Sequence, residues 1–332
     1  MRGNGRVRQT ILLADKLVQT AVIILLLTAV LLTTALGVQW YLDGRNFLAD
    51  LIERRRLNRR TLSEWDVLRE QTQDRSDIII SLTTIPERIA LIAPTIKSLI
   101  AQSRQAARIL LWIPNDSVRS GMDYVLPEWL QGLEGLEIHR CKDMGPATKF
   151  LYAVRENKPD TRILIVDDDK IYPQGFVEQI EKQSDLFPDY ALGYSGWRVP
   201  ADLTDRPTTL WMNIRRKPPA PMKSAWVKGL YPVDILQGYS GYLVKPRFFK
   251  VAELWDYSEA PAAAFYVDDV WISAHCRVPK MVFKAKRFCI EPFVWRSHYR
   301  KTSLGMQNRG KGTPADRNNT VMIKFFSDRW QH

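Results

Sequence analysis

The chain has 332 residues, of which 45% are hydrophobic and 25% charged, and this ordinary globular composition excludes a wholly disordered protein. The formal net charge is +12, and residues 277–332 alone carry 13 Lys/Arg against 3 Asp/Glu, which indicates an anionic partner. The 3 cysteines are too scattered for a disulfide framework or a zinc site. No nucleic-acid-binding motif is present, so we expect no nucleic-acid partner.

Residues 1–16 form a short basic N-terminal tail, and residues 17–42 contain no charged side chain. A helix of that length, rising 1.5 Å per residue, spans the ~30 Å hydrocarbon core of a bilayer. We therefore expect a single-pass transmembrane helix; the alternative is a cleaved signal peptide, whose apolar core is usually shorter. Basic residues flank both ends almost equally, so sidedness stays open. Their balance slightly favours a cytosolic catalytic domain at a bacterial inner membrane over a Golgi-type lumenal one.

Residues 43–75 are predicted to form a helical basic stalk. Neither Pro nor Gly interrupts residues 46–72, and Leu48, Leu51 and Ile52 have helical spacing. The basic run in this segment either lies on anionic lipid headgroups or forms a solvated helix face, and both interpretations stay open.

Residues 76–332 are predicted to form one α/β domain. Near-continuous apolar strands that alternate with helices are typical of a mostly parallel sheet covered by helices on both faces. The Pro-rich basic segment 200–232 predicts an irregular excursion or lid. The expected strands are 77–82, 108–113, 136–139, 162–166 and 190–194, and the expected helices are 89–102 and 175–182.

An acidic run, Asp167, Asp168 and Asp169, directly follows the expected strand 162–166. Ligands of open α/β sheets bind at the carboxyl ends of strands. Along an extended chain, Asp167 and Asp169 point to one side and Asp168 to the other. Because the carboxylates repel one another, a hard divalent cation with oxygen ligands is the natural occupant. The alternative is a solvated acidic turn.

The acidic run, written IVDDDKIYP, resembles the DxD motif of GT-A-fold glycosyltransferases, in particular the family-2-like group. Three further segments resemble that group in the expected order, and together they cover roughly residues 77–300. SLTTIPERI resembles the loop that receives the nucleotide base, and DMGPATKF the segment that flanks nucleotide and sugar. YVDDVWIS resembles the late acidic motif that holds the catalytic base.

This resemblance implies a GT-A (Rossmann-like) fold and a hexosyltransferase-type, inverting enzyme. Such an enzyme transfers a sugar from a nucleotide-sugar, with UDP favoured, to a hydroxyl of a glycan or glycolipid acceptor. It uses a divalent metal, Mn²⁺ or Mg²⁺, that bridges the diphosphate and offsets the charge developing on it.

The resemblance also implies roles for individual residues on the donor side. Asp169 and Asp167 would bind the metal, with Asp167 also able to contact the ribose, and a late histidine, His298, would complete the metal site. The remaining implied donor-binding residues are Thr83 and Asp143 at the nucleoside, Arg88 at a phosphate, and Lys149 and Asp168.

The late motif offers two candidates for the general base, Asp268 and Asp269. A positioned carboxylate takes the proton of the acceptor hydroxyl as the hydroxyl attacks the anomeric carbon, and a separate base implies inversion. Related enzymes often have Glu-Asp here, whereas this chain has Asp-Asp, so the choice stays open with Asp269 favoured. The alternative role is an acidic cap at a helix N-terminus.

The acceptor side is predicted from GYSGYLV at 238–244, which resembles the acceptor loop of these enzymes. Gly238 and Gly241 permit close backbone approach. Trp197 and Trp271 are the candidates for stacking on a sugar ring.

Three other functions are alternatives to that of a glycosyltransferase. A sugar-nucleotide nucleotidyltransferase needs a Gly-rich loop after the first strand, whereas TTIPER contains no glycine. An aspartyl phosphohydrolase needs a Thr or a second Asp pattern after the strand, and DDDKIYP supplies no such hydroxyl. A non-catalytic, membrane-tethered binding protein with an incidental acidic turn stays open.

Overall fold

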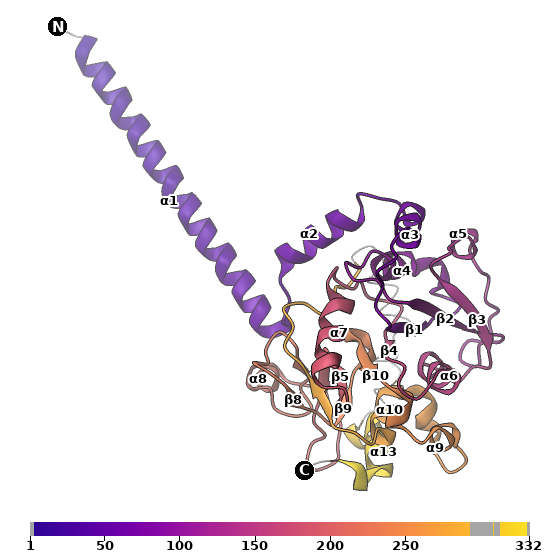
Figure 1. The fold of residues 1–332 in the computed structure, drawn as a ribbon. Coiled ribbons are helices and arrows are strands. Elements are labelled where there is room, and N and C mark those ends of the chain that lie inside the picture. The colour runs from indigo at the N-terminus through magenta and orange to yellow at the C-terminus, as the bar shows by residue number, and fades with distance from the viewer. Residues whose placement is uncertain (1–2, 293–307, 309–312, 331–332) are drawn as a thin grey trace. The chain divides into compact units, whose positions relative to one another are not determined.

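The structure is a computed structural model that describes residues 3–292, 308 and 313–330, and it comprises two compact units, Met1–Leu48 and Ala49–His332. The first unit consists almost entirely of the long helix α1 (Gly3–Asp43) (Figure 1). The stretch Asp15–Asp43 of α1 is long and apolar enough to cross a membrane. This agrees with the expected apolar segment 17–42 in length and composition.

The second unit is a mixed α/β domain preceded by two short helices. Apart from α1, the α-helices that the structure describes are α2 (Phe47–Leu57), α3 (Leu62–Glu70), α4 (Ala93–Ile100), α5 (Glu128–Gln131), α6 (Thr148–Glu156), α7 (Phe176–Leu186), α8 (Leu210–Arg215), α9 (Val251–Trp255), α10 (Asp268–His275) and α13 (Asn318–Phe325). The strands are β1 (Ile79–Thr83), β2 (Arg108–Pro114), β3 (Glu137–Cys141), β4 (Ile163–Ile165), β5 (Ala191–Gly193), β6 (Ser195–Trp197), β7 (Met222–Lys223), β8 (Tyr231–Pro232), β9 (Ile235–Leu236), β10 (Tyr242–Val244) and β11 (Lys280–Val282).

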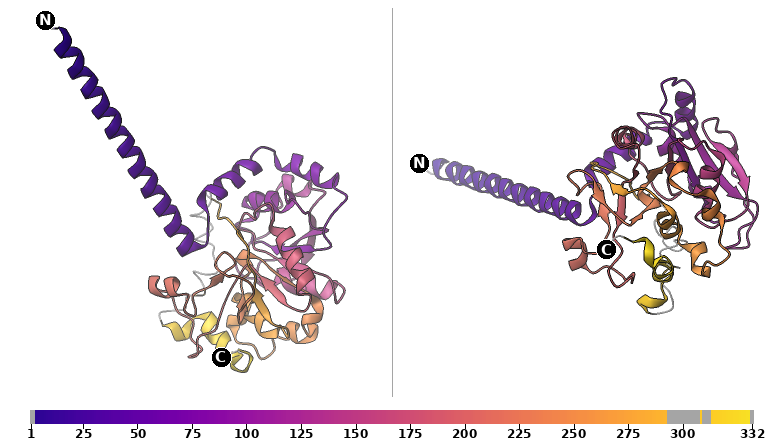
Figure 2. Two further views of the ribbon diagram at one scale, coloured as in Figure 1. Left: turned by 60° about the vertical axis from the view of Figure 1, so that its left-hand side comes forward. Right: turned by 60° about the horizontal axis from the view of Figure 1, so that its bottom comes forward.

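The main sheet has eight strands in the order β3-β2-β1-β4-β10-β5-β11-β8. Figure 2 shows the unit that contains this sheet from two further directions. The β3-β2, β2-β1, β1-β4 and β5-β11 pairs are parallel, whereas β10 and β8 run antiparallel to their neighbours. The predicted mostly parallel sheet is thus confirmed. The carboxyl ends of β1, β2, β3 and β4 meet at one edge because these strands are parallel neighbours.

Both faces of the sheet are buried, which explains the near-continuous apolar strands. In β1 and the residue before it, Ile78, Ile80 and Leu82 pack with α4 and α7 on one face. Ile79 points to the other face and packs with α6, α9 and α10. This alternation follows from the two-residue period of a strand. The predicted helical cover on both faces is therefore confirmed.

Several elements differ from their expected bounds. The expected helix 89–102 begins with a 3₁₀ turn, Ile89–Leu91, and α4 starts only at Ala93, because a proline such as Pro94 is tolerated only in the first helical turn. The expected stalk helix is broken, since Thr61 caps α3 and exchanges hydrogen bonds with Glu64. Helix α6 and the small antiparallel sheet β7-β6-β9 were not anticipated.

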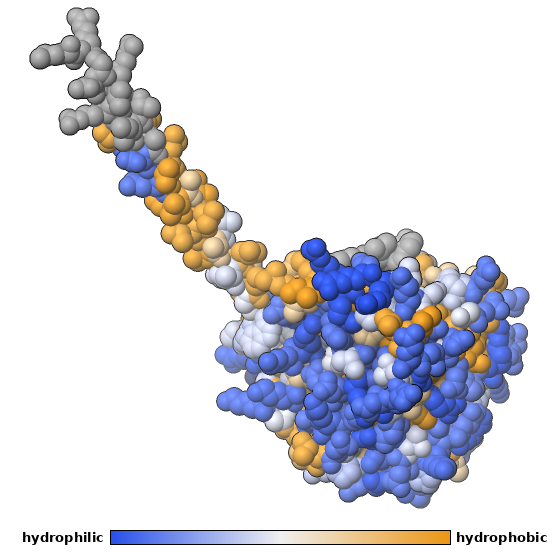
Figure 3. Space-filling view, turned by 45° about the horizontal axis from the view of Figure 1, so that its top comes forward, coloured by the Kyte–Doolittle hydropathy of each residue, from blue (hydrophilic) through white to orange (hydrophobic). Residues whose placement is uncertain are grey.

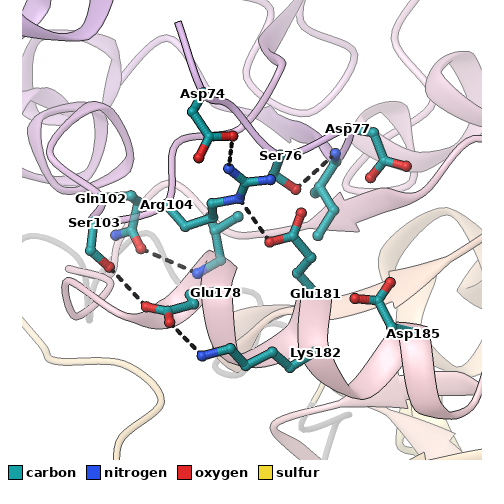
Figure 4. Close-up of polar contacts among 12 residues, drawn as sticks. Asp74, Ser76, Asp77, Gln102, Ser103, Arg104, Glu178, Glu181, Lys182 and Asp185 are labelled. Atoms are coloured by element: carbon teal, nitrogen blue, oxygen red, sulfur yellow. Dashed lines mark hydrogen bonds and ion pairs between the residues drawn. The ribbon is translucent and has the colours of Figure 1, made fainter. Parts of the chain in front are cut away.

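A network of ion pairs attaches the segment that enters β1 to helix α7 (Figure 4). Arg104 contacts Asp74 and, at 3.0 Å, Glu181. Glu178 accepts from Ser103 at 3.4 Å and also pairs with Lys182. This network lies on the surface, so each pair adds little to stability, about 0–1 kcal/mol.

Gly241, between a 3₁₀ turn and β10, is expected to tolerate no side chain. Its φ is +87°, and a Cβ there would lie 2.5 Å from Cζ of Phe176. Gly241→Ala should therefore lower the free energy of unfolding by about 1–3 kcal/mol. Gly229→Ala is the matched control, because a Cβ at Gly229 meets nothing within 4 Å. Equal unfolding midpoints for the two variants, measured by denaturant titration, would refute this account of Gly241.

Candidate active site

A cavity of about 350 Å³ opens where β1, β2, β3 and β4 end, and the small sheet and the start of α10 complete its wall. Because these elements lie far apart in the sequence, only the fold brings their side chains together. Of the residues singled out in the sequence, those that line the cavity are Thr83, Arg88, Asp143, Lys149, Asp167, Asp168, Asp169, Trp197, Asp268 and Asp269.

Asp168 is buried and its carboxylate is bound by the loop after β1. Thr84 Oγ1 donates to Asp168 Oδ2 at 2.6 Å, and the Arg88 guanidinium donates to Oδ1 at 2.8 Å. Burial opposes the charge on Arg88, but the carboxylates of Asp168 and Asp169 outweigh it and raise the pKa of Arg88. Asp168 therefore joins the TTIPER loop to the acidic run, and Arg88 is held by carboxylates at the cavity wall.

The acidic run does not continue as an extended chain. Asp168 and Asp169 form a turn, so Arg88 Nη1 reaches both, at 2.8 Å from Asp168 Oδ1 and 3.7 Å from Asp169 Oδ2. The expected strict alternation of the three side chains is wrong beyond Asp167 for this reason. Asp169 also pairs with Lys170 at 3.0 Å. Burial opposes ionisation of Asp169, but Lys170 and Arg88 outweigh it and lower its pKa.

Lys149, from the first turn of α6, joins the two acidic motifs. Its Nζ lies 2.6 Å from Asp167 Oδ1 and 2.9 Å from Asp268 Oδ2. Burial would lower the pKa of Lys149, yet Asp167 and Asp268 raise it well above its ordinary range. The ammonium group therefore stays charged and supplies part of the positive charge expected between the carboxylates.

The two aspartates at the start of α10 differ in their partners. Asp268 is paired with Lys149, whereas Asp269 Oδ1 accepts a hydrogen bond from the backbone N–H of Gly238 at 3.0 Å. Burial, and then repulsion from Asp268, raise the pKa of Asp269 well above its ordinary range. The lack of a side chain at Gly238 permits this close approach of its backbone to Asp269. A Cβ there would lie 3.2 Å from both Asp167 Oδ1 and Lys149 Nζ.

The end of β1 and the loops after β2 and β3 also line the cavity. Asp143 accepts hydrogen bonds from the backbone N–H groups of Val118, at 2.8 Å, and Gly145, at 2.7 Å. Thr83 Oγ1 donates to the carbonyl of Trp112 at 2.8 Å. These contacts hold the loops in shape, and both side chains remain at the cavity surface.

The predicted acceptor residues are placed less uniformly. Trp197 is buried and lines the cavity. Trp271 is buried in the same apolar cluster as Trp197, is stacked on Tyr257, and its indole N–H donates to the Leu254 carbonyl at 3.1 Å. None of Gly238, Gly241 and Trp271 is among the cavity-lining residues that the structure describes. His298 lies outside the described residues.

Sequence reasoning did not single out several polar residues of the cavity. Lys170 is one, although its place next to Asp169 was a readable signal. Tyr172 is fully buried behind the wall, and its hydroxyl accepts from the Asp167 N–H at 2.9 Å, so it holds the acidic run in position. Nothing in the sequence pattern marks the others, which include Ser117, Arg119, Tyr124, Gln237 and Tyr239.

No protein-family model matches the chain, and no curated protein matches it in sequence. Among solved structures it is similar to S. aureus TarS 1-349 in complex with UDP, at 13% identity and a TM-score of 0.44, over 76% of this chain and 71% of that chain. The same TarS fragment in complex with UDP-GlcNAc is similar at 12% identity and a TM-score of 0.42, over 64% of this chain and 57% of that chain. GalNAc-T7 with UDP, GalNAc and Mn²⁺ is similar at 12% identity and a TM-score of 0.41, over 64% of this chain and 43% of that chain. The chain spans 59% of the length of a further TarS 1-349 structure.

Proposed function

We propose that this chain is a glycosyltransferase that transfers a hexose from a UDP-sugar to a hydroxyl of a glycan or glycolipid, with inversion. The observation that carries the proposal is the assembly of one cavity from four motif segments. Thr83 to Arg88, Gly145 to Lys149, Asp167 to Asp169, and Asp268 to Val270 all contribute to its wall. In the same proposal, α1 anchors the enzyme in a membrane.

The charge of the cavity supports a cation together with an anionic donor. The described lining includes six aspartates against two arginines and two lysines, a formal excess of two negative charges. A nucleoside diphosphate would add more negative charge. A divalent cation offsets that charge, whereas a further anion without one would be repelled.

Asp167 and Asp169 would hold the metal. Asp169 lies at the cavity wall with Lys170 Nζ 3.0 Å from its Oδ1, and Asp167 is 30% exposed at the cavity surface, so both carboxylates fit oxygen ligands of Mn²⁺ or Mg²⁺. Among the described residues no group of three or more His, Cys, Asp or Glu side chains has metal-binding geometry. Phosphate and water oxygens would therefore complete the coordination, and the bound metal would offset charge on the departing diphosphate.

Asp269 is the proposed general base. Its Oδ1 is held by Gly238, so the carboxylate is fixed in orientation at the cavity wall. Asp268 is instead engaged by Lys149 and helps to keep that ammonium group beside Asp167. The raised pKa of Asp269 suits a group that must take a proton from a hydroxyl.

The test is release of UDP from a panel of UDP-sugars by the full chain, with and without Mn²⁺ or Mg²⁺. We expect release to depend on metal, acceptor and one donor sugar. Release of pyrophosphate from sugar phosphate and UTP would instead favour a nucleotidyltransferase. Neither turnover nor nucleotide binding would favour a binding protein.

Asp169→Ala should remove the Mn²⁺ dependence of UDP binding. The substitution deletes one of the two proposed metal ligands, and calorimetric titration with and without Mn²⁺ measures the effect. Asp143→Ala serves as the control, because Asp143 binds backbone N–H groups and should change affinity without changing metal dependence. An unchanged metal response in Asp169→Ala would place the metal elsewhere.

A further inference from the structure

Helix α2 packs against the rest of its unit through charged side chains. Arg287 reaches Asp50 at 3.5 Å and Glu53 at 3.3 Å, and it donates to the carbonyl of Ala49 at 2.9 Å. Arg54 donates to the backbone carbonyl of Glu291. Glu53 is only 3% exposed, so the inward face of α2 is largely polar.

The outward face of the same helix is apolar. Leu51 is 40% exposed and Ile52 is 71% exposed, and Arg55 lies on the same side one turn later. A surface helix of a water-soluble domain normally buries its apolar stripe and exposes its charges. In α2 this polarity is reversed, although the visible surface of the unit is otherwise mostly hydrophilic (Figure 3).

The sequence position of α2 indicates what covers this face. Ile52 follows the last residue of α1, Asp43, by nine residues, so the chain keeps the two within about 30 Å of each other. If α1 spans a bilayer, the exposed face of α2 is therefore close to the lipid surface. Arg55 and Arg59, both exposed, would complement anionic headgroups there.

A second surface has the same chemistry. Helix α8 exposes 63% of Leu210 and 56% of Trp211, and the Arg215 guanidinium lies 3.9 Å from the centroid of the Trp211 ring. Tryptophan and arginine are residues that favour the membrane interface.

We propose that α2 is an interfacial helix that lies on a lipid bilayer, with Leu51 and Ile52 in the acyl boundary and Arg55 and Arg59 among anionic headgroups. Leu210 and Trp211 of α8 offer a second exposed surface of the same interfacial chemistry. The proposal rests on the proposed anchoring by α1 but not on the proposed catalysis. A consequence of the proposal is that the second unit is held in a fixed orientation on the membrane.

To test this, single cysteines introduced into the full chain are labelled with an environment-sensitive fluorophore. The chain carries Cys276→Ser, because Cys276 is partly exposed, whereas Cys141 and Cys289 are buried. The protein is reconstituted in phosphatidylcholine vesicles containing phosphatidylglycerol. Ile52→Cys is the test position, and Leu186→Cys on α7, 68% exposed, is the matched control. We expect lipid-attached nitroxides to quench the label at 52 and aqueous iodide to quench the label at 186.

A label at Leu31→Cys in α1 reports anchoring separately. Lipid quenching at 31 with full iodide access at 52 would overturn the inference while leaving the anchor intact. Iodide access at both positions would mean that the anchoring proposal has failed. Protection at 52 without lipid quenching would identify a protein partner, such as a second copy of the chain, and would also overturn the inference.

Discussion

Replacing Asp269 with Asn is expected to reduce sugar transfer by about 10²–10⁴-fold while leaving UDP affinity unchanged. The amide has nearly the same size as the carboxylate, and its oxygen still accepts from the Gly238 N–H. It cannot, however, take the proton of the acceptor hydroxyl. The turnover number and the dissociation constant of UDP, measured on the same preparation, separate the two effects.

Asp268→Asn is the matched variant for that experiment. Asp268 is paired with Lys149, so loss of the Asp268 carboxylate should displace the Lys149 ammonium group. The substitution should therefore weaken donor binding more than it slows proton transfer. A larger loss of turnover in Asp268→Asn than in Asp269→Asn would assign the base to Asp268. If UDP binding disappears in Asp269→Asn, the residue is structural and the proposed role fails.

Arg88→Met is expected to destabilise the second unit by about 3–5 kcal/mol. Among the residues that the structure describes, the substitution leaves the buried Asp168 carboxylate with the Thr84 hydroxyl as its side-chain partner. Breaking one half of a buried ion pair costs this much because the remaining charge is uncompensated. Denaturant unfolding monitored by tryptophan fluorescence measures the change.

Two controls make this prediction specific. Arg104→Met removes an arginine that pairs mainly at the surface, with Asp74 and Glu181, and should cost only about 0–1 kcal/mol. Adding Asp168→Asn to Arg88→Met should recover part of the lost stability, since the buried charge is then removed. Equal stabilities of Arg88→Met and Arg104→Met would show that the Arg88–Asp168 pair carries no special energy.

The sequence alone was sufficient for the elements whose pattern is local. The strands β1, β2 and β4 were predicted because their apolar residues are nearly continuous and each ends in a polar loop. The mostly parallel sheet and the helices on its two faces followed from the alternation of those strands with helical segments. The acidic run was placed at the carboxyl end of β4 for the same reason, because it directly follows a buried strand.

Only the tertiary structure decided how the charges are paired. Lys149 is 18 residues from Asp167 and 119 from Asp268, and no periodicity in the sequence predicts that one ammonium group joins them. The pairing of Arg88 with Asp168, and the turn that brings Asp169 to the same guanidinium, likewise depend on where β1 and β4 end in space. The polarity of α2 is a further case, because the spacing of Leu51 and Ile52 defines an apolar stripe but does not say which way it faces. Ion pairs and helix faces depend on distances between residues remote in the chain, and those distances are fixed only by packing.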